Sequence, residues 1–426
     1  MTAAAGTRIE RRFDIDNTTR RAGFSLAACW AVAVLVLAGV PSPGRAGRAV
    51  AQSRAPSGWA AFTRSFDEYA RTDGIVGGRV LSLRNGRVVA DHAFGLGDRA
   101  RGTPPEPEAV YHWASITKTL TAIAIMQLRD RGRLRLDDPV TRWVPELRQV
   151  HDTFGAMDDV TLRMLLSHSA GFQNPTWPYG QGRPWEPFEP TRWDQLAAMM
   201  PYQELGFRPG SRFGYSNPGF IYLGRVIEAL SGDPWAVYIQ KNIWTPLGMT
   251  RSFVGTSPYH LAPLRAGSYT IRADSGRTRI DPNPREFDPG ITRSNSGWNA
   301  PMSDVVTYVA FLTRAAGGDS TLAWRYDGVL RRTTLEEMWR PVVPLKVGGG
   351  MDDAFGLSFY RYRRGGHTVV GHTGEQSGFR SFLYFDPATT AAVIGIVNTI
   401  NEANPDASSH GWDALTQQAV TVVAAP

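Results

Sequence analysis

The spacing of apolar residues predicts a sheet near both ends of the chain. An amphipathic helix is expected over 57–72, where large aromatic residues recur every three or four positions. Two strands over 76–84 and 87–94 follow, joined by Asn85-Gly86, a favoured sequence for a two-residue hairpin turn. This start is typical of an antiparallel sheet with a helix packed against it.

The middle of the chain is expected to be helical and rich in loops. Helices are predicted over 115–131, 161–167, 192–201, 218–231 and 235–242. A surface loop is predicted over 173–191, because this stretch holds five prolines. The aromatic residues of the loop either wall a substrate cleft or pack on the helical region; they are Trp177, Tyr179, Trp185 and Phe188.

Strands resume after residue 300. They are expected over 354–362, 367–372, 379–386 and 391–398, with a closing helix over 409–424. Strands at both ends with helices between them predict an α/β (α+β) fold, in which an antiparallel sheet flanked by N- and C-terminal helices is interrupted by an all-helical insertion. The expected sheet domain comprises 52–114 and 300–426. The helical domain covers 115–299, with the active site at the interface.

The first 51 residues have the pattern of a targeting segment. Several arginines precede an apolar run over 22–40, and Ala49-Val50-Ala51 follows as a small-residue cleavage site. We expect cleavage after Ala51 and a mature protein that is periplasmic or secreted. The apolar run has 19 residues, which is just enough to span a bilayer. An uncleaved inner-membrane anchor through 22–40 is therefore the alternative.

Composition narrows the classes of function. Residues 1–51 contribute +4 (seven Arg against three acidic residues) of the formal net charge of +7, which leaves +3 for the remainder. No basic run follows, so nucleic acid is not an expected partner. One cysteine, Cys29, excludes an internal disulfide, and the eight histidines lack metal-ligand spacing. We expect no metal or cofactor, and a monomer that acts on a small molecule or a peptide.

The first motif that could carry chemistry is Ser115-Ile-Thr-Lys118, at the start of an apolar helix. Residues three apart share a helix face, which places Lys118 one turn from Ser115. The chain has only three lysines, Lys118, Lys241 and Lys346, among 46 basic residues, and only Lys118 has a serine three positions before it. Burial lowers the pKa of an amine, and a neutral amine can take the serine proton. Alone, the motif also fits a serine cap followed by a surface lysine.

Two further motifs follow along the chain. Tyr-Ser-Asn at 215–217 precedes a helix. Tyr215 can share the proton transfer if a nearby cation lowers its pKa, and Asn217 offers an amide to a substrate carbonyl. His-Thr-Gly at 372–374 lies on an expected strand, which can bind substrate backbone by strand addition, and Gly374 allows close approach. Each motif alone also fits an ordinary turn or strand end.

The three motifs together resemble those of a known family. SITK, YSN and HTG, in this order and about 100 and 155 residues apart, resemble the motifs of serine β-lactamases and penicillin-recognising serine hydrolases. The chain is most similar to the branch with Tyr-x-Asn as the second motif, which holds class C β-lactamases, DD-carboxypeptidases, D-aminopeptidases and related esterases. The resemblance covers roughly 59–424 and implies a β-lactamase/transpeptidase-like fold.

The resemblance also implies roles for individual residues. Ser115 matches the nucleophile, Lys118 the base and Tyr215 the proton relay, and the backbone N–H groups of Ser115 and Glu375 match the oxyanion hole. Substrate-binding positions are implied at Asn217, His372, Thr373, Gly374 and Glu375. The implied activity is cleavage of an ester or amide bond through an acyl-enzyme on Ser115. The alternatives are a D-alanyl-D-alanine carboxypeptidase or β-lactamase, and a slow-acylating penicillin-binding sensor.

The sequence departs from the family pattern at several positions. His372 stands where class C β-lactamases usually have lysine. The Gly-Leu pair at 356–357 is not followed directly by the arginine with which carboxypeptidases bind a terminal carboxylate. The nearby arginines that could substitute are Arg361, Arg363 and Arg364. Glu375 stands where small residues are frequent, and its side chain is expected to point to solvent. His168 is expected to be a structural hydrogen-bonding residue.

Overall fold

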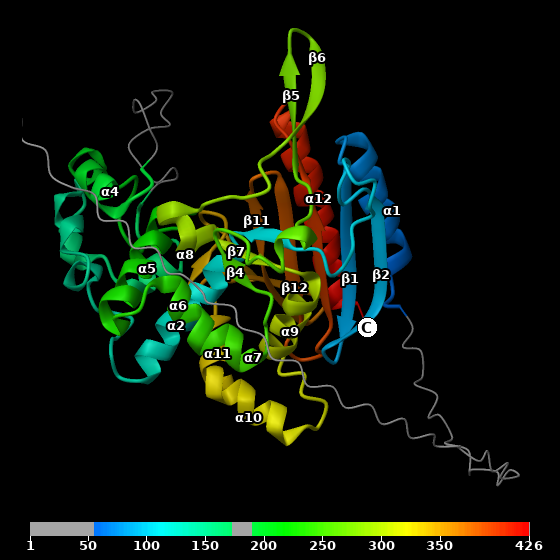
Figure 1. Ribbon diagram of the computed structural model, residues 1–426. Helices are drawn as coiled ribbons and strands as arrows, with labels where there is room; N and C mark the ends of the chain where they lie inside the picture. The colour runs from blue at the N-terminus through cyan, green and yellow to red at the C-terminus, as the bar shows by residue number, and fades with distance from the viewer. Residues whose placement is uncertain (1–54, 173–189, 426) are drawn as a thin grey trace, which may run out of the picture. The chain divides into compact units, whose positions relative to one another are not determined.

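The computed structural model describes residues 55–172 and 190–425 (Figure 1). All of them belong to the second of the two units into which the chain divides, Met1–Ala51 and Gln52–Pro426. The targeting segment expected over 1–51 lies outside the described residues, as do the loop aromatics Trp177, Tyr179, Trp185 and Phe188. Within the described ranges, no helix is long and apolar enough to cross a bilayer.

An antiparallel sheet forms the centre of this unit, as expected. In the part of the chain that the structure describes, it has eight strands. Their spatial order is β2 (Arg87–Gly95), β1 (Gly77–Arg84), β13 (Ala392–Val397), β12 (Phe379–Phe385), β11 (His367–Gln376), β10 (Tyr360–Arg364), β9 (Asp353–Phe355) and β8 (Val343–Pro344). Gly78 of β1 lies opposite Val397 of β13. The first hairpin and the last long strand of the chain are therefore neighbours in one sheet.

The N- and C-terminal helices cover one face of this sheet. Figure 1 shows α1 (Trp59–Thr72) and α12 (Pro405–Ala424) side by side on this face. The aromatic spacing of α1 directs Phe62 toward the sheet, where its ring meets that of Phe382 edge-on with 6.5 Å between centroids. Trp412 of α12 packs on the same ring at 5.7 Å. Burial of large aromatic side chains thus holds both helices on the sheet.

A helical layer covers the opposite face. Its central helix is α2 (Thr117–Asp130), whose side chains are buried from Thr117 to Leu128. A helix that is buried on all sides needs helical neighbours. The other helices are α3 (Leu162–Leu166), α4 (Trp193–Met199), α5 (Asn217–Ser231), α6 (Trp235–Ile239), α7 (Thr245–Leu247), α8 (Arg293–Ser296), α9 (Met302–Leu312), α10 (Ser320–Val329) and α11 (Arg332–Met338). Of these, α5, α6 and α8 pack on α2.

The strand expected over 354–362 is instead the hairpin β9–β10. Gly356 N–H donates to the carbonyl of Phe359 at 2.8 Å, which closes a tight turn. Ser358 has φ 69°, in the left-handed region that non-glycine residues seldom adopt. The prediction of one strand therefore missed a reversal of the chain.

Smaller elements were also absent from the sequence prediction. Helices α9, α10 and α11 lie between residues 300 and 340, where no helix was expected. A hairpin of β5 (Tyr269–Asp274) and β6 (Arg277–Pro282) lies in the stretch expected to be helical, with β14 (Thr399–Asn401) parallel to β5. A third sheet contains β3 (Tyr111–Ala114), β7 (Trp298–Ala300) and β4 (Phe253–Val254), and β3 leads directly to Ser115.

Candidate active site

Ser115 lies at a sharp turn between β3 and α2. Ala114 has φ 48°, in the left-handed region, and the β3–β7 pairing is irregular at this point. Backbone strain of this kind persists only where the surrounding structure imposes it. The Lys118 N–H then donates to the Ser115 carbonyl at 3.0 Å, so Ser115 lies two residues before α2 rather than at its first position.

The Lys118 side chain is fully buried and reaches Ser115. Its Nζ lies 2.9 Å from Ser115 Oγ, 2.8 Å from Asn217 Oδ1 and 2.9 Å from the main-chain oxygen of Asn295. None of the ion pairs formed by the described residues involves this amine. Burial without a carboxylate holds the pKa of Lys118 well below its usual value, which favours the neutral amine.

Tyr215 lies beside the same two groups. Its hydroxyl hydrogen-bonds with Ser115, and its ring centroid lies 5.0 Å from Lys118 Nζ. The sequence suggested that a nearby cation could lower the pKa of Tyr215. Instead, burial raises this pKa well above its usual value, and the hydrogen bond with Ser115 offsets only part of the increase. Tyr215 therefore stays a neutral phenol that can accept and donate a proton.

His168 supports the turn that carries Tyr215, as expected of a structural residue. It is fully buried, and its Nδ1 accepts a hydrogen bond from the Ser216 N–H at 3.1 Å. Its ring lies 4.3 Å from that of Tyr215. Burial, together with the nearby Lys118, holds the pKa of His168 well below its usual value, so this imidazole carries no charge.

The third motif lies on β11, next to Ser115. A Cβ atom on Gly374 would lie 2.4 Å from the Trp113 carbonyl oxygen and 3.1 Å from Ser115 N, so only glycine lets the strand pass this close. Thr373 is half-buried beside it. His372 is fully buried, and its Nδ1 donates to the Thr373 carbonyl at 2.5 Å. Burial and Lys118 lower the pKa of His372 to about 3, so it is neutral.

Two expectations about side chains near the site can be compared with the structure. The Glu375 side chain does not simply point to solvent, because Arg380 Nε lies 2.7 Å from its Oε2. Arg361 donates to the Met351 carbonyl at 2.9 Å. Arg364 pairs with Asp353 at 2.5 Å. Among the contacts of the described residues, none joins the arginines of β10 to Ser115 or Tyr215.

Some groups at the site were not predicted from the sequence. The Asn295 carbonyl in α8 binds Lys118, but a main-chain oxygen leaves no residue-type signal. Ser381 of β12 donates to the Trp113 carbonyl at 3.0 Å and so joins β12 to the strand before Ser115. Ser381 lies opposite Gly374 in the β11–β12 hairpin. The register of that hairpin could have predicted this position.

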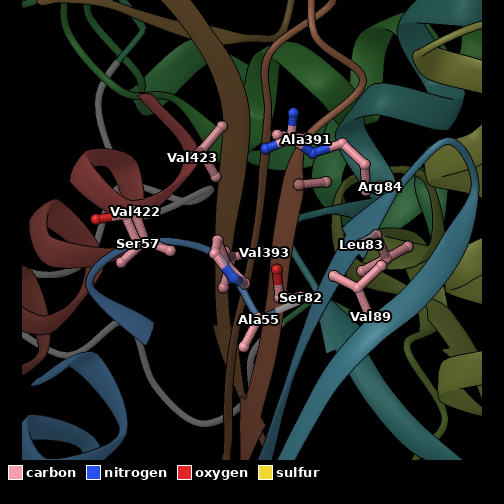
Figure 2. A pocket seen from close by; sticks show the side chains of 12 residues that line it. Ala55, Ser57, Ser82, Leu83, Arg84, Val89, Ala391, Val393, Val422 and Val423 are labelled. Carbon is pink, nitrogen blue, oxygen red and sulfur yellow. The ribbon is translucent and has the colours of Figure 1, made fainter. Parts of the chain in front are cut away.

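One cavity among the described residues lies apart from the expected site residues. A cavity of about 550 Å³ lies between the start of α1, strands β1 and β13, and the end of α12. Figure 2 shows the side chains that line it, including Ser82, Val393 and Val422, and no expected site residue is among them. Over the described ranges, no group of three His, Cys, Asp or Glu side chains could hold a metal ion.

The fold and its similarities to known proteins define the class of protein. A serine just before a helix and a buried lysine in its first turn, next to an antiparallel sheet, are typical of acyl-enzyme serine hydrolases. Residues 62–418 match the family described as Beta-lactamase. The chain belongs to this β-lactamase family of serine hydrolases.

Individual relatives differ in their functions. Esterase EstB of Burkholderia gladioli is 33% identical over 208 residues, covering 46% of this chain and 52% of the esterase. Penicillin-binding protein 4* of Bacillus subtilis (strain 168) is 28% identical over 327 residues, covering 74% and 66% of the two chains. The octameric penicillin-binding protein homologue from Pyrococcus abyssi has a TM-score of 0.65 at 25% identity, covering 84% and 77%. The chain thus spans only about half the length of the esterase.

Proposed function

We propose that this chain is an exported serine hydrolase that cleaves an ester or amide bond of an uncharged substrate through an acyl-enzyme on Ser115. The observation that carries the proposal is the set of groups around Lys118 Nζ. A neutral amine has two N–H donors and one lone pair. Two of its three neighbours, Asn217 Oδ1 and the Asn295 carbonyl, are acceptors that take the two N–H groups. The lone pair is then left for the Ser115 hydroxyl, 2.9 Å away.

The proposed reaction follows from these positions. The Ser115 hydroxyl proton moves to Lys118 Nζ as Oγ forms a bond to the substrate carbonyl carbon. The carbonyl oxygen becomes an oxyanion, and the bond to the leaving alcohol or amine breaks as that group takes a proton from Lys118 through the Tyr215 hydroxyl. Water then attacks the acyl-enzyme, gives up a proton along the same path, and releases the acid and Ser115.

Stabilisation of the oxyanion is assigned in this proposal to two backbone N–H groups. These belong to Ser115 and to Glu375, the residue after Gly374. Support comes from the close approach of β11 to Ser115 N at Gly374. Loss of one such donor typically lowers turnover by about 10²–10³.

The charge of the site supports an uncharged substrate. His372 and His168 are neutral, and Arg361 and Arg364 of β10 bind other groups. A carboxypeptidase needs a cation for the terminal carboxylate of its substrate. The similarity to esterase EstB agrees with an ester as the acyl donor.

A substrate panel tests the activity. Purified protein is assayed with p-nitrophenyl esters, a D-alanyl-D-alanine peptide, an amino acid amide and a chromogenic cephalosporin. We expect ester turnover with a fluorophosphonate adduct located on Ser115 by mass spectrometry, and none in Ser115→Ala. An adduct on another serine refutes the assignment. An adduct on Ser115 without turnover of any substrate supports the slow-acylating sensor instead.

Export rests on the sequence of residues 1–51. N-terminal sequencing of the protein from the periplasm or medium is expected to begin near Gln52. If membrane-bound protein still begins at Met1, the segment is not cleaved and acts as a membrane anchor instead.

A further inference from the structure

The end of β11 is tied to other elements on both of its faces. Glu375 and Gln376 are adjacent, so their side chains leave the strand in opposite directions. Glu375 binds Arg380, and Gln376 lies within hydrogen-bond distance of His112. The inference drawn from these two ties rests on the proposed function, in which the Glu375 N–H belongs to the oxyanion hole.

Arg380 is an unusual partner for a half-exposed glutamate. The Glu375 side chain is 49% exposed, whereas that of Arg380 is only 2% exposed. Arg380 and Glu375 lie directly opposite each other in the β11–β12 hairpin, and 2.7 Å separates Nε from Oε2. An ion pair between two mobile surface side chains contributes little. Here one partner is buried, so its position is fixed.

The helices behind the sheet hold the Arg380 guanidinium in place. Its Nη1 donates to the Ser408 carbonyl at 3.0 Å, to Ser408 Oγ at 2.7 Å and to the Tyr69 hydroxyl at 3.2 Å. Ser408 in turn donates to Asp73 Oδ2 at 2.6 Å. Arg380 therefore connects α1 and α12 to Glu375, the residue after Gly374, which lies close to Ser115 N.

The opposite tie joins β11 to β3. His112 is 1% exposed, and its Nε2 lies 3.0 Å from Gln376 Oε1. Its Nδ1 lies 3.1 Å from Asn299 Oδ1, and that oxygen accepts a hydrogen bond from Arg265 at 2.7 Å. His112 is three residues before Ser115, so this tie connects the two strands that carry the proposed oxyanion donors.

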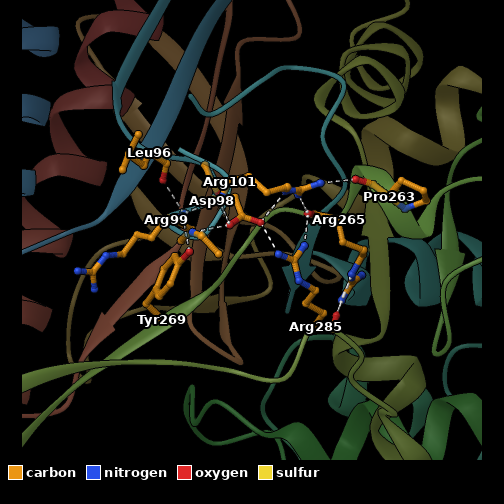
Figure 3. A network of polar contacts seen from close by, with 11 residues as sticks. Leu96, Asp98, Arg99, Arg101, Pro263, Arg265, Tyr269 and Arg285 are labelled. Atoms are coloured by element: carbon orange, nitrogen blue, oxygen red, sulfur yellow. Dashed lines mark hydrogen bonds and ion pairs between the residues drawn. The ribbon is translucent and has the colours of Figure 1, made fainter. Parts of the chain in front are cut away.

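A polar network fixes the far end of this second tie. Figure 3 shows Arg265 beside Arg285 and Asp98. Arg265 donates to the Arg285 carbonyl at 2.6 Å, and Arg285 binds the buried Asp98 at 2.5 Å. Gly374, directly before the two tied residues, has no room for a side chain beside Ser115. The peptide between Gly374 and Glu375 carries the Glu375 N–H. A small rotation of this peptide would change the direction of that N–H.

We propose that Arg380 is a positioning residue that, by binding the Glu375 side chain, fixes the direction of the Glu375 backbone N–H toward the substrate carbonyl oxygen. The donor is needed most when negative charge develops on that oxygen. Loss of the tie therefore lowers kcat and weakens transition-state analogues, while ground-state binding changes little.

The test compares variants of the full chain. Arg380→Met and Glu375→Ala remove the tie, whereas Arg380→Lys and Glu375→Gln keep a donor or an acceptor. Arg364→Met, which breaks the Arg364–Asp353 pair on β10, is the matched control. The measurements are kcat and KM for a p-nitrophenyl ester, the inhibition constant of phenylboronic acid, which forms an oxyanion-like adduct on serine, and the melting temperature.

We expect Arg380→Met and Glu375→Ala to lower kcat about tenfold or more and to weaken the boronate similarly, with KM within about twofold. In Arg380→Lys and Glu375→Gln, kcat should decrease by a smaller factor. The kcat of Arg364→Met should equal that of wild type. If Arg380→Met does not fold, Glu375→Ala decides alone, because this side chain is half-exposed.

Three results overturn the proposal. Folded Glu375→Ala with wild-type kcat shows that the tie does not position the donor. A Glu375→Gln variant that is faster than wild type shows that charge, not position, is the effect of the pair. If Arg364→Met loses as much kcat and stability as Arg380→Met, the effect is a general structural one. Failure of the proposed function is distinguishable, since wild-type protein would then form no adduct on Ser115.

Discussion

Replacing Lys118 with methionine tests whether the buried amine is neutral in the folded protein. Methionine has a similar length and no charge, so it fits the same apolar surroundings. In the folded state the pKa of Lys118 lies well below its usual value because the side chain is fully buried without a carboxylate. In the unfolded chain it returns to about 10.4. Between these two values only the unfolded state binds the proton.

The sign and size of the effect follow from proton linkage. The unfolded state binds one more proton than the folded state, so wild-type stability increases with pH in this window by about 1.4 kcal/mol per pH unit from Lys118 alone. The contribution is lost as pH falls toward the folded pKa. Lys118→Met lacks this dependence. The titrating groups whose pKa Lys118 does not affect are common to both proteins and cancel in the difference.

Urea denaturation of wild type and Lys118→Met at pH 7, 8 and 9 measures this difference. We expect the wild-type free energy of unfolding to rise with pH relative to the variant, by at most about 1.4 kcal/mol per pH unit. The variant should also lose about 10² or more in acylation rate, the usual scale for a lost general base. Parallel pH dependences would show that Lys118 is protonated in the folded protein. That result refutes its role as the base.

Three further substitutions test other parts of the site. Tyr215→Phe removes the proposed relay hydroxyl and should lower ester turnover by about 10-fold to 100-fold, measured as kcat at pH 7.5; unchanged kcat would exclude the relay. His168→Leu leaves the buried Ser216 N–H unpaired and should lower the free energy of unfolding in urea by about 1–3 kcal/mol. Wild-type stability would contradict the role of His168 in supporting the turn that carries Tyr215. Gly374→Ala puts a Cβ 2.4 Å from the Trp113 carbonyl. It should lower both the melting temperature and the labelling rate, and normal labelling would show that β11 can retreat.

The sequence predicted the parts of the site that depend on local geometry. Ser115 and Lys118 were expected to meet because residues three apart lie on one side of a helical turn, and their side chains are 2.9 Å apart. The spacing of Ser115, Tyr215 and Gly374 along the chain could not predict that they lie close together. Their proximity depends on how the sheet and the helical layer pack. Only the family resemblance supplied it.

Features that depend on backbone conformation escaped prediction. The Asn295 carbonyl that binds Lys118 could belong to any residue type. The β9–β10 reversal places Ser358 at a positive φ without proline or an Asn-Gly pair to mark it. The Glu375–Arg380 pair was accessible in principle. Ser377 and Gly378 both have positive φ, as a two-residue hairpin turn requires, and such a turn sets these two side chains opposite each other.

The burial of Lys118 has a practical consequence for attaching the protein to surfaces. Amine-reactive esters couple to accessible, unprotonated lysines. Lys118 is fully buried, so the lysine side chains open to such reagents are Lys241, which is 59% exposed, and the exposed Lys346. Neither contacts Ser115 among the described residues. Coupling through lysine side chains therefore uses few positions, and neither of them contacts the nucleophile.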